Sequence, residues 1–531
     1  MFLSLQFLGV YAPCSRMNFG ENNTSSINPS RLSVNHPLML RGSAVRSSAT
    51  SSTVVRTHNS LVIDSPKELE RLDHEELNKG VVGVNNYSGK FGKYGGKYVP
   101  ETLISFLGKL EAEFYSAVRD PEFQEALATA LKDYVGRETP LYFAERLTNH
   151  YKNENGEGPE LYLKREDLNH GGAHKINNSI AQAMLAMRMG RTSIVAATGA
   201  GQHGVATAAA CAKLALDCTI FMGTQDMQKQ PFNVSQMKLL GAQVESVEGS
   251  FKDATSEAIR RWVGSLDTSY YLSGTVVGPH PSPSMVREFQ SVIGKETRRQ
   301  AMEKWEGKPD VLVACVGSGS NAMGMFHEFL GDEDVRLIGV EAAGFGLDSG
   351  KHSATLARGD VGVYHGTMSY LLQDEEGQIL WPHSIGVGLE YPAVGPELSF
   401  LKDTKRAEFY SVADQEAVEE YLRLCRLEGI IPAMEASHAL AILEKLCPGL
   451  PNGAKVVVNV SGRGDKDAEM INDHRRQQET DSDVAESEQR NCRTADIRVD
   501  GVNDGQIAKS TDSTAYREQS RRIRRQIAES T

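Results

Sequence analysis

The chain has 531 residues and a formal net charge of −12, and 40% of its residues are hydrophobic and 24% are charged. This composition is typical of a soluble globular protein with two or three domains. Because there is no excess positive charge to displace counterions, and no apolar run reaches the roughly 18–20 residues that span a bilayer, we expect neither a nucleic-acid nor a membrane partner.

The first 60 residues differ in composition from the rest of the chain. They are rich in Ser, contain several Arg but no Lys, and hold one acidic residue, Glu21. Such termini are typical of organelle transit peptides. We therefore interpret residues 1–80 as a transit peptide and disordered leader, and the high Ser content favours the chloroplast over the mitochondrion. An ordinary disordered tail is the alternative.

The middle of the chain alternates between helical segments and short apolar runs. The runs are TSIVAAT (192–198), DCTIFMG (217–223), DVLVACVG (310–317), VRLIGVEA (335–342) and KVVVNVSG (455–462). Short apolar runs between helices indicate buried parallel strands, and their alternation with helices predicts a doubly wound α/β fold. Ligands in such folds bind at the carboxyl ends of the strands, where three of these runs lead into glycine-rich loops.

Four stretches could carry chemistry. In NHGGAHKINN, Lys175 stands near a helix start, where burial and the helix dipole disfavour its charged form and suit a Schiff-base amine. In VAATGAGQHGV, His203 is the residue able to exchange a proton. The CVGSGSNAMG loop suits a phosphate, although it matches no dinucleotide fingerprint, and Ser461 follows a strand. The alternatives are a solvated lysine and ordinary turns, but together these features describe a pyridoxal phosphate site.

The C-terminal end is polar and densely charged, with few large apolar residues. We expect residues 468–531 to form a disordered tail. A short basic helix near the C-terminus and an artefact of the gene model are the alternatives.

Seven motifs in this order carry a family resemblance. They are GKFGKYGGKYVPETL, GRETPLYFAERLT, LKREDLNHGGAHKINN, ATGAGQHGVATA, GPHPSPSMVREF, EGIIPAMEASHAL and SGRGDKD. The chain from Gly83 to Asp467 closely resembles the tryptophan synthase β subunit in its plant form. The resemblance implies a fold-type II pyridoxal-phosphate enzyme with two doubly wound parallel-sheet domains, 81–288 and 289–467. The first would include a mobile communication subdomain at about 190–275.

The resemblance also assigns roles to individual residues. Lys175 would attach pyridoxal phosphate, and Ser461 would face the ring nitrogen. The remaining cofactor-binding residues would be His174, Gln202, Gly317, Ser318, Gly319, Ser320, Asn321 and Glu435. The loop that holds the substrate carboxylate would comprise Thr198, Gly199, Ala200, Gly201, Gln202 and His203. The resemblance also suggests a monovalent cation as a ligand. Separately, the chain has seven cysteines but no C-x-x-C pair, so we predict no metal cluster.

Several positions depart from the family pattern. Ala197 replaces the Glu that assists loss of the serine hydroxyl and hydrogen-bonds the indole N–H, and losing a general acid or base commonly costs ~10²–10⁴-fold in rate. Ser318 replaces a Gly, Ser282 replaces a Tyr, and the segment 386–392 reads GVGLEYP where the family reads SAGLDYP. Together these changes suggest an altered active site.

One changed pair keeps its charges. The family pairs an Arg of the communication subdomain with an Asp when the subunit closes, and here these positions read Lys229 and Glu390. We expect a weaker pair, because Lys lacks the bidentate fork of Arg. The loop before Lys252 is about three residues shorter than in the family, where it faces the α subunit.

The resemblance leads to three functional hypotheses. In the first, the chain binds pyridoxal phosphate and the tryptophan synthase α subunit in an α₂β₂-type assembly around a β homodimer. It couples indole to L-serine poorly, and promotes cleavage of indole-3-glycerol phosphate with release of indole. The second is a working tryptophan synthase β subunit. The third is a serine deaminase or another β-replacement enzyme.

Overall fold

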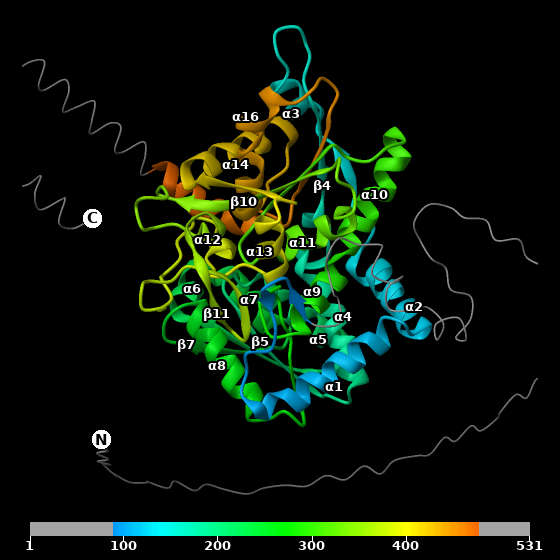
Figure 1. The fold of residues 1–531 in the computed structure, drawn as a ribbon, viewed down its shortest axis with the longest axis vertical. Helices are drawn as coiled ribbons and strands as arrows, with labels where there is room; N and C mark the ends of the chain where they lie inside the picture. Colours follow the sequence, from blue (N-terminus) through cyan, green and yellow to red (C-terminus); the bar gives the residue numbers. More distant parts are fainter. Residues whose placement is uncertain (1–88, 477–531) are drawn as a thin grey trace, which may run out of the picture. The chain divides into compact units, whose positions relative to one another are not determined.

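The structure is a computed structural model, and it describes residues 89–476 (Figure 1). The predicted leader 1–80 and most of the predicted tail lie outside the described residues. The tail is predicted to begin at residue 468, but residues 468–476 are helical and Ile471 is buried in a hydrophobic cluster. The ordered part therefore extends beyond the predicted boundary, because Ile471 and Met470 pack against that cluster.

The larger sheet has six strands in the order β13-β10-β9-β14-β4-β3. All neighbours are parallel except the antiparallel pair β3–β4. The strands are β3 (Leu141–Phe143), β4 (Glu160–Lys164), β9 (Val311–Cys315), β10 (Arg336–Gly344), β13 (Glu408–Ala413) and β14 (Lys455–Asn459).

Both faces of this sheet are covered by helices. On β9, the side chains of Val311, Val313 and Cys315 belong to one hydrophobic cluster, and those of Leu312 and Ala314 belong to another. Successive side chains of a strand point to opposite faces, so every residue of β9 is buried. This explains why the sequence shows a continuous apolar run here, as predicted for a doubly wound sheet.

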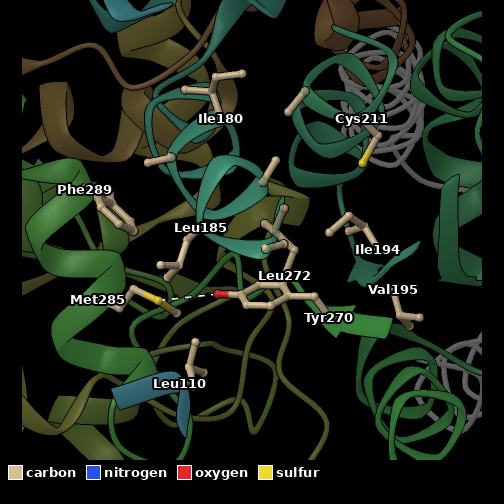
Figure 2. Packing of buried hydrophobic residues seen from close by; sticks show 14 of the residues in the cluster. Leu110, Ile180, Leu185, Ile194, Val195, Cys211, Tyr270, Leu272, Met285 and Phe289 are labelled. Atoms are coloured by element: carbon tan, nitrogen blue, oxygen red, sulfur yellow. Dashed lines mark hydrogen bonds between the residues drawn. The ribbon is translucent and has the colours of Figure 1, made fainter. Parts of the chain in front are cut away.

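A second sheet has four parallel strands in the order β7-β6-β5-β8. They are β5 (Ser193–Thr198), β6 (Asp217–Gly223), β7 (Gln243–Val247) and β8 (Ser269–Tyr271). The core beside this sheet is shown in Figure 2, where Tyr270 of β8 directs its hydroxyl toward Met285. The helices contribute mainly Ala, Leu and Phe side chains to this core.

A third, antiparallel sheet was not predicted. Its order is β1-β2-β12-β11, with β1 (Lys90–Phe91), β2 (Tyr94–Gly95), β11 (Asp360–Tyr364) and β12 (Thr367–Leu371). Two-residue strands are too short to show a hydrophobic period.

The helices connect and cover these sheets. The longer ones are α1 (Glu101–Ala117), α2 (Pro121–Ala130), α4 (Lys175–Arg188), α5 (Gln202–Leu214), α7 (Pro231–Leu239), α8 (Phe251–Val263), α9 (Ser282–Gln290), α10 (Val292–Trp305), α13 (Pro396–Asp403), α14 (Asp414–Glu428) and α15 (Met434–Ala441). The shorter ones are α3 (Glu145–His150), α6 (Thr224–Lys229), α11 (Ser320–Phe326), α12 (Thr355–Arg358) and α16 (Leu443–Leu446). Single turns are η1 (Leu131–Val135), η2 (Glu166–Leu168), η3 (His170–Gly172), η4 (His327–Phe329), η5 (Val387–Leu389), η6 (Cys447–Gly449) and η7 (Asp465–Asp467).

The sheets do not divide the chain at the predicted boundary between residues 288 and 289. The six-stranded sheet takes β3 and β4 from the predicted first domain and its other four strands from the second. Parallel strands can be recruited from distant parts of a chain through crossover connections, and the apolar pattern carries no information about strand order. The four-stranded sheet occupies residues 193–271, within the segment predicted as the communication subdomain.

Candidate functional site

A cavity of about 110 Å³ collects most of the residues that the sequence singles out. It is lined by residues that follow β5, β9 and β14 and by the start of α4. The predicted residues in its lining are Lys175, His174, Thr198, Gly199, Ala200, Gln202, His203, Gly317, Ser318, Gly319, Ser320, Asn321, Glu390, Glu435 and Ser461. Three predicted residues, Ala197, Gly201 and Lys229, lie outside this lining.

The Lys175 amine sits at the first position of α4 and faces this cavity. Its Nζ donates to the carbonyl oxygen of Gly274 at 2.6 Å and to Ser320 Oγ at 3.0 Å. Burial lowers the pKa of Lys175 to about 8, against smaller opposing effects of Cys315 and Glu435. The amine is therefore much closer to its neutral, nucleophilic form than an exposed lysine would be.

His174 ties the lysine segment to two loops. Its Nδ1 lies 3.0 Å from the carbonyl oxygen of Ser461, and its Nε2 lies 3.1 Å from Ser320 Oγ. A carbonyl oxygen only accepts, so Nδ1 carries the proton and Nε2 accepts from the serine hydroxyl. Burial, followed by the charge of Lys175, lowers the pKa of His174 to about 3, which keeps the ring neutral.

The loop 317–321 forms one wall of the cavity between β9 and α11. Gly319 has φ +100°, and a Cβ atom there would lie 2.0 Å from Leu398 Cδ1. A Cβ on Gly317 would lie 2.9 Å from the carbonyl oxygen of Gly388. Ser318, by contrast, is not among the described residues with positive φ. The loop backbone therefore tolerates serine at this departure from the family pattern.

Ser461 lies across the cavity from this loop, at the end of β14. Its Oγ is 3.7 Å from Cys315 Sγ at the end of the neighbouring strand β9. Asn321 anchors the same strand end by donating to the carbonyl oxygen of Cys315 at 2.9 Å. An amine, a glycine-containing loop and a hydroxyl thus surround one cavity. These groups fit pyridoxal phosphate: the amine suits its carbonyl carbon, the loop suits its phosphate, and the hydroxyl suits its ring nitrogen.

The segment from Thr198 to His203 connects β5 to α5 along the same cavity. Thr198 Oγ1 accepts from the backbone N–H of Gly204 at 3.1 Å, and Asn233 Nδ2 donates to the carbonyl oxygen of Ala200 at 2.6 Å. Gly201 has φ +85°, and a Cβ there would lie 2.5 Å from Asn233 Cβ. Gly201 therefore shapes the turn, whereas its neighbours line the cavity.

His203 is not placed to donate a proton to a ligand in the cavity. Its Nε2 lies 3.1 Å from the carbonyl oxygen of Leu272 and must donate to it, and its Nδ1 is buried without a partner among the described residues. Burial, followed by the charge of Lys175, lowers the pKa of His203 to about 3. The ring is neutral at physiological pH and has no proton to give at its free nitrogen.

Ala197 contributes only a methyl group, and that group packs in an apolar cluster. The residue is 3% exposed and pairs with Phe221 on the neighbouring strand β6. Its hydrophobic cluster includes Leu107, Leu110 and Trp262. No carboxylate stands at this position, so Ala197 supplies neither an acid nor a base.

Among the described residues, two carboxylates line the cavity, and both are ion-paired. Glu390 accepts from Lys229 Nζ at 2.9 Å and 3.2 Å, so the pair expected from the sequence is formed. Glu435 accepts from the backbone N–H of Gly388 at 2.9 Å and lies 3.1 Å from Lys466 Nζ. Burial would raise the pKa of Glu435, but Lys466 holds it below its usual value.

Several residues that line the cavity were not predicted from the sequence. Lys466 is buried between Glu435 and Asp467, and the SGRGDKD motif was a signal that could have revealed it. Cys315 also lines the cavity, directly before the glycine loop. Phe251, at the start of α8, and Tyr391, after η5, are far apart in the sequence, which gives no sign of their proximity; their ring centroids lie 5.5 Å apart.

A second cavity of about 200 Å³ adjoins the first. Phe251, Thr275 and Tyr391 line both. Most of its other lining side chains are apolar and come from α1, α8 and the segment around residue 277. Helices α1 and α8 lie side by side (Figure 1), with the Phe106 and Trp262 rings in edge contact at 5.2 Å.

Within 89–476, no helix has the length and apolar character to cross a membrane, and no cluster of three His, Cys, Asp or Glu side chains is placed to hold a metal.

Comparison with known proteins identifies relatives of this architecture. Residues 133–462 match the family model described as pyridoxal-phosphate dependent enzyme. A fungal L-serine ammonia-lyase from Rhizomucor miehei superimposes with a TM-score of 0.50 at 18% identity, covering 64% of this chain and 97% of that one. The likeness to this L-serine ammonia-lyase shows the fold alone.

Two further solved structures have lower TM-scores. The processed form of threonine deaminase isoform 2 from Solanum lycopersicum gives 0.49 at 18% identity, covering 80% of this chain and 99% of that one. A threonine deaminase from T.th. gives 0.49 at 20% identity, covering 66% of this chain and 97% of that one. The family match confirms the predicted fold-type II architecture and pyridoxal phosphate as the cofactor.

Proposed function

The chain belongs to the family of pyridoxal-phosphate-dependent enzymes, and from this premise we propose that it is a tryptophan synthase β-like protein impaired in coupling indole to L-serine. Pyridoxal phosphate, when bound, stabilises negative charge at Cα of an amino acid and so permits loss of a group from Cβ. The Lys175 amine, the loop 317–321 and Ser461 would hold the cofactor, and the segment 198–203 would orient the amino-acid carboxylate.

One observation carries the impaired coupling. The lysine site is intact, whereas Ala197 presents a methyl group in an apolar cluster, and both carboxylates that line the cofactor cavity among the described residues are ion-paired. Ala197 itself therefore offers no acid to help a hydroxyl leave and no acceptor for the N–H of an aromatic nucleophile. Losing such a group commonly costs ~10²–10⁴-fold in rate.

The adjoining apolar cavity supports an aromatic second substrate. Its volume of about 200 Å³ and its aromatic and aliphatic lining suit a neutral bicyclic ring such as that of indole. It joins the cofactor cavity at Phe251, Thr275 and Tyr391, so a nucleophile in it would stand beside the reacting amino acid.

The kept ion pair supports a role alongside a partner. In this proposal, a tryptophan synthase α subunit binds the chain in an α₂β₂-type complex around a homodimer in the chloroplast. Closure through Lys229 and Glu390 then activates the α subunit toward indole-3-glycerol phosphate. Indole that is not consumed leaves the complex.

The test is a product assay. The holoprotein is mixed with a plant α subunit, indole-3-glycerol phosphate and L-serine, and free indole and tryptophan are quantified together. We expect indole well above the level of the α subunit alone, with little tryptophan. Tryptophan at the rate of an ordinary β subunit would contradict the proposal and establish a working synthase.

A pyruvate assay with the holoprotein and L-serine, without an α subunit, tests a second candidate, serine deamination. Without an aromatic partner, an amino acid that has lost its Cβ hydroxyl can hydrolyse to pyruvate and ammonia. If the hydroxyl is still lost from L-serine, the absence of an acid at Ala197 favours hydrolysis to pyruvate over coupling to indole. Pyruvate formed from L-serine without an α subunit, in the absence of raised indole, would favour this candidate.

A further inference from the structure

A third, polar cavity of about 70 Å³ lies beside the Lys229–Glu390 pair. It is lined from α6, the start of α8 and the segment 379–392. Four residues, Gly199, Phe251, Val387 and Glu390, line both this cavity and the cofactor cavity and so form the wall between them.

Asp226 brings an unpaired negative group to this polar cavity. The residue is 3% exposed, and its Oδ2 has no hydrogen-bond partner among the described residues. The carboxylate also accepts from the backbone N–H of Phe251. Burial, followed by the Glu390 charge, raises the pKa of Asp226 to about 6, so the group is ionised at pH 8. An unsatisfied buried carboxylate oxygen is costly, and a cationic donor in the cavity would relieve that cost.

Lys252 brings an unpaired positive group to the same cavity. Its Nζ lies over the ring of Trp381 at 5.6 Å from the centroid, and no carboxylate among residues 89–476 forms an ion pair with it. The other cation of the cavity, Lys229, is already held by Glu390 at 2.9 Å. Asp226 and Lys252 are thus the anion and the cation of this cavity that form no ion pair among the described residues, although the Lys229 charge also acts on Asp226 and lowers its pKa.

We propose that this polar cavity is a binding site for a zwitterionic α-amino acid, whose ammonium pairs with Asp226 and whose carboxylate pairs with Lys252. The site lies one wall away from the cofactor cavity, and that wall contains Glu390. An amino acid bound here enters the cofactor cavity when Glu390 and its partner Lys229 separate. The apolar cavity on the other side of Phe251 has no such pair of charges and suits a neutral molecule.

Only the identity of the amino acid, L-serine, rests on the proposed function. A simple anion would leave Asp226 unpaired, and a simple cation would leave Lys252 unpaired. A zwitterion pairs with both groups. Loss of either charged hydrogen bond would weaken binding of the zwitterion by about tenfold.

The experiment uses the fluorescence of Trp381, which lies in this site. The full-length holoprotein is mixed rapidly with L-serine, and tryptophan fluorescence and cofactor absorbance are recorded together. We expect a fast fluorescence phase that saturates with L-serine and disappears in Trp381→Phe. Its half-saturating concentration should rise about tenfold in Asp226→Asn and in Lys252→Met. Glycerate, which lacks the ammonium, and ethanolamine, which lacks the carboxylate, should bind at least tenfold more weakly.

Two control substitutions, one at the start of β6 and one in α7, remove charges outside the site. Asp217→Asn and Lys238→Met, both at exposed positions, should leave the half-saturating concentration unchanged. An unchanged value in Asp226→Asn and Lys252→Met, or a fast phase that persists in Trp381→Phe, would overturn the site. Failure of the proposed function gives a different result: the product assay shows no rise in indole, or tryptophan at the rate of an ordinary β subunit, while the fast fluorescence phase and its dependence on Asp226 and Lys252 remain.

Discussion

At the scale of single residues, burial sets the chemistry of the site. Lys175 donates to Gly274 and Ser320 rather than to a carboxylate, and burial lowers its pKa to about 8. The same burial keeps His174 and His203 neutral. The amine is thus the group in this cavity whose protonation changes near physiological pH.

A pH dependence of cofactor capture follows from this burial. Because the neutral amine is the nucleophile, the rate at which the apoprotein takes up pyridoxal phosphate should rise with pH and level off above about 8. The rate is measured by the recovery of cofactor absorbance between pH 6 and 10, with Lys175→Arg as the inactive control. A rate that still rises tenfold per pH unit from pH 9 to 10 would show the ordinary lysine pKa of about 10.4 instead.

At the scale of elements, α6 is joined to the loop after η5 by the Lys229–Glu390 pair. The Lys229 side chain is 47% exposed, so the pair contributes about 0–1 kcal/mol to stability. Lys229→Met should therefore change the free energy of unfolding by less than about 1 kcal/mol, yet lower the indole released in the presence of the α subunit. The double exchange Lys229→Glu with Glu390→Lys should recover part of that release. A Lys229→Met variant with full indole release would contradict a role in closure.

The start of α4 rests on a buried charge cluster. Arg137 donates to Asn177 Oδ1 of α4 at 2.9 Å and pairs with Glu166 at 2.8 Å and Glu296 at 2.6 Å. Lys164 pairs with Glu296 at 2.7 Å and balances the charge of the cluster. The cluster thereby fixes the helix turn that carries the cofactor lysine.

Removing one charge from this cluster should destabilise the fold. Glu166→Gln leaves an uncompensated buried cation and should lower the free energy of unfolding in urea by about 3–5 kcal/mol. Burial would raise the pKa of Glu166, but Arg137 and then Lys164 hold it well below its usual value. The stabilisation is therefore complete above the unfolded-state pKa of about 4.3, and the difference from wild type should shrink as the pH falls below it.

The control for this prediction is an exposed glutamate on α2. Glu125→Gln should change stability by less than about 0.5 kcal/mol at every pH. Equal effects of the two substitutions would mean that the buried cluster does not stabilise the fold.

At the scale of the whole molecule, the sequence predicts the parallel strands and the loops at their carboxyl ends. The apolar runs carry that information, because a strand buried on both faces must be apolar throughout. The same loops bring Lys175, Ser461 and the segment 317–321 to one cavity, as predicted.

Other features depend on packing between distant segments. The apolar cavity is bounded by α1, α8 and Tyr391, whose sequence separation hides their proximity. The antiparallel sheet includes strands of two residues, and the six-stranded sheet crosses the predicted domain boundary. Lys466 pairs with Glu435 only after β14 has placed its loop beside α15. None of these features follows from a local pattern.

In the proposed function, Ala197 breaks the coupling of indole to L-serine in an otherwise intact site. The most direct measurement compares tryptophan formation by wild type, Ala197→Glu and the size-matched control Ala197→Gln, each with the α subunit, indole-3-glycerol phosphate and L-serine. Ala197→Glu should form tryptophan ~10²–10⁴ times faster than wild type, with less free indole, and Ala197→Gln should not. Equal tryptophan rates for wild type and Ala197→Glu, with both proteins folded and loaded with cofactor, would contradict the claim.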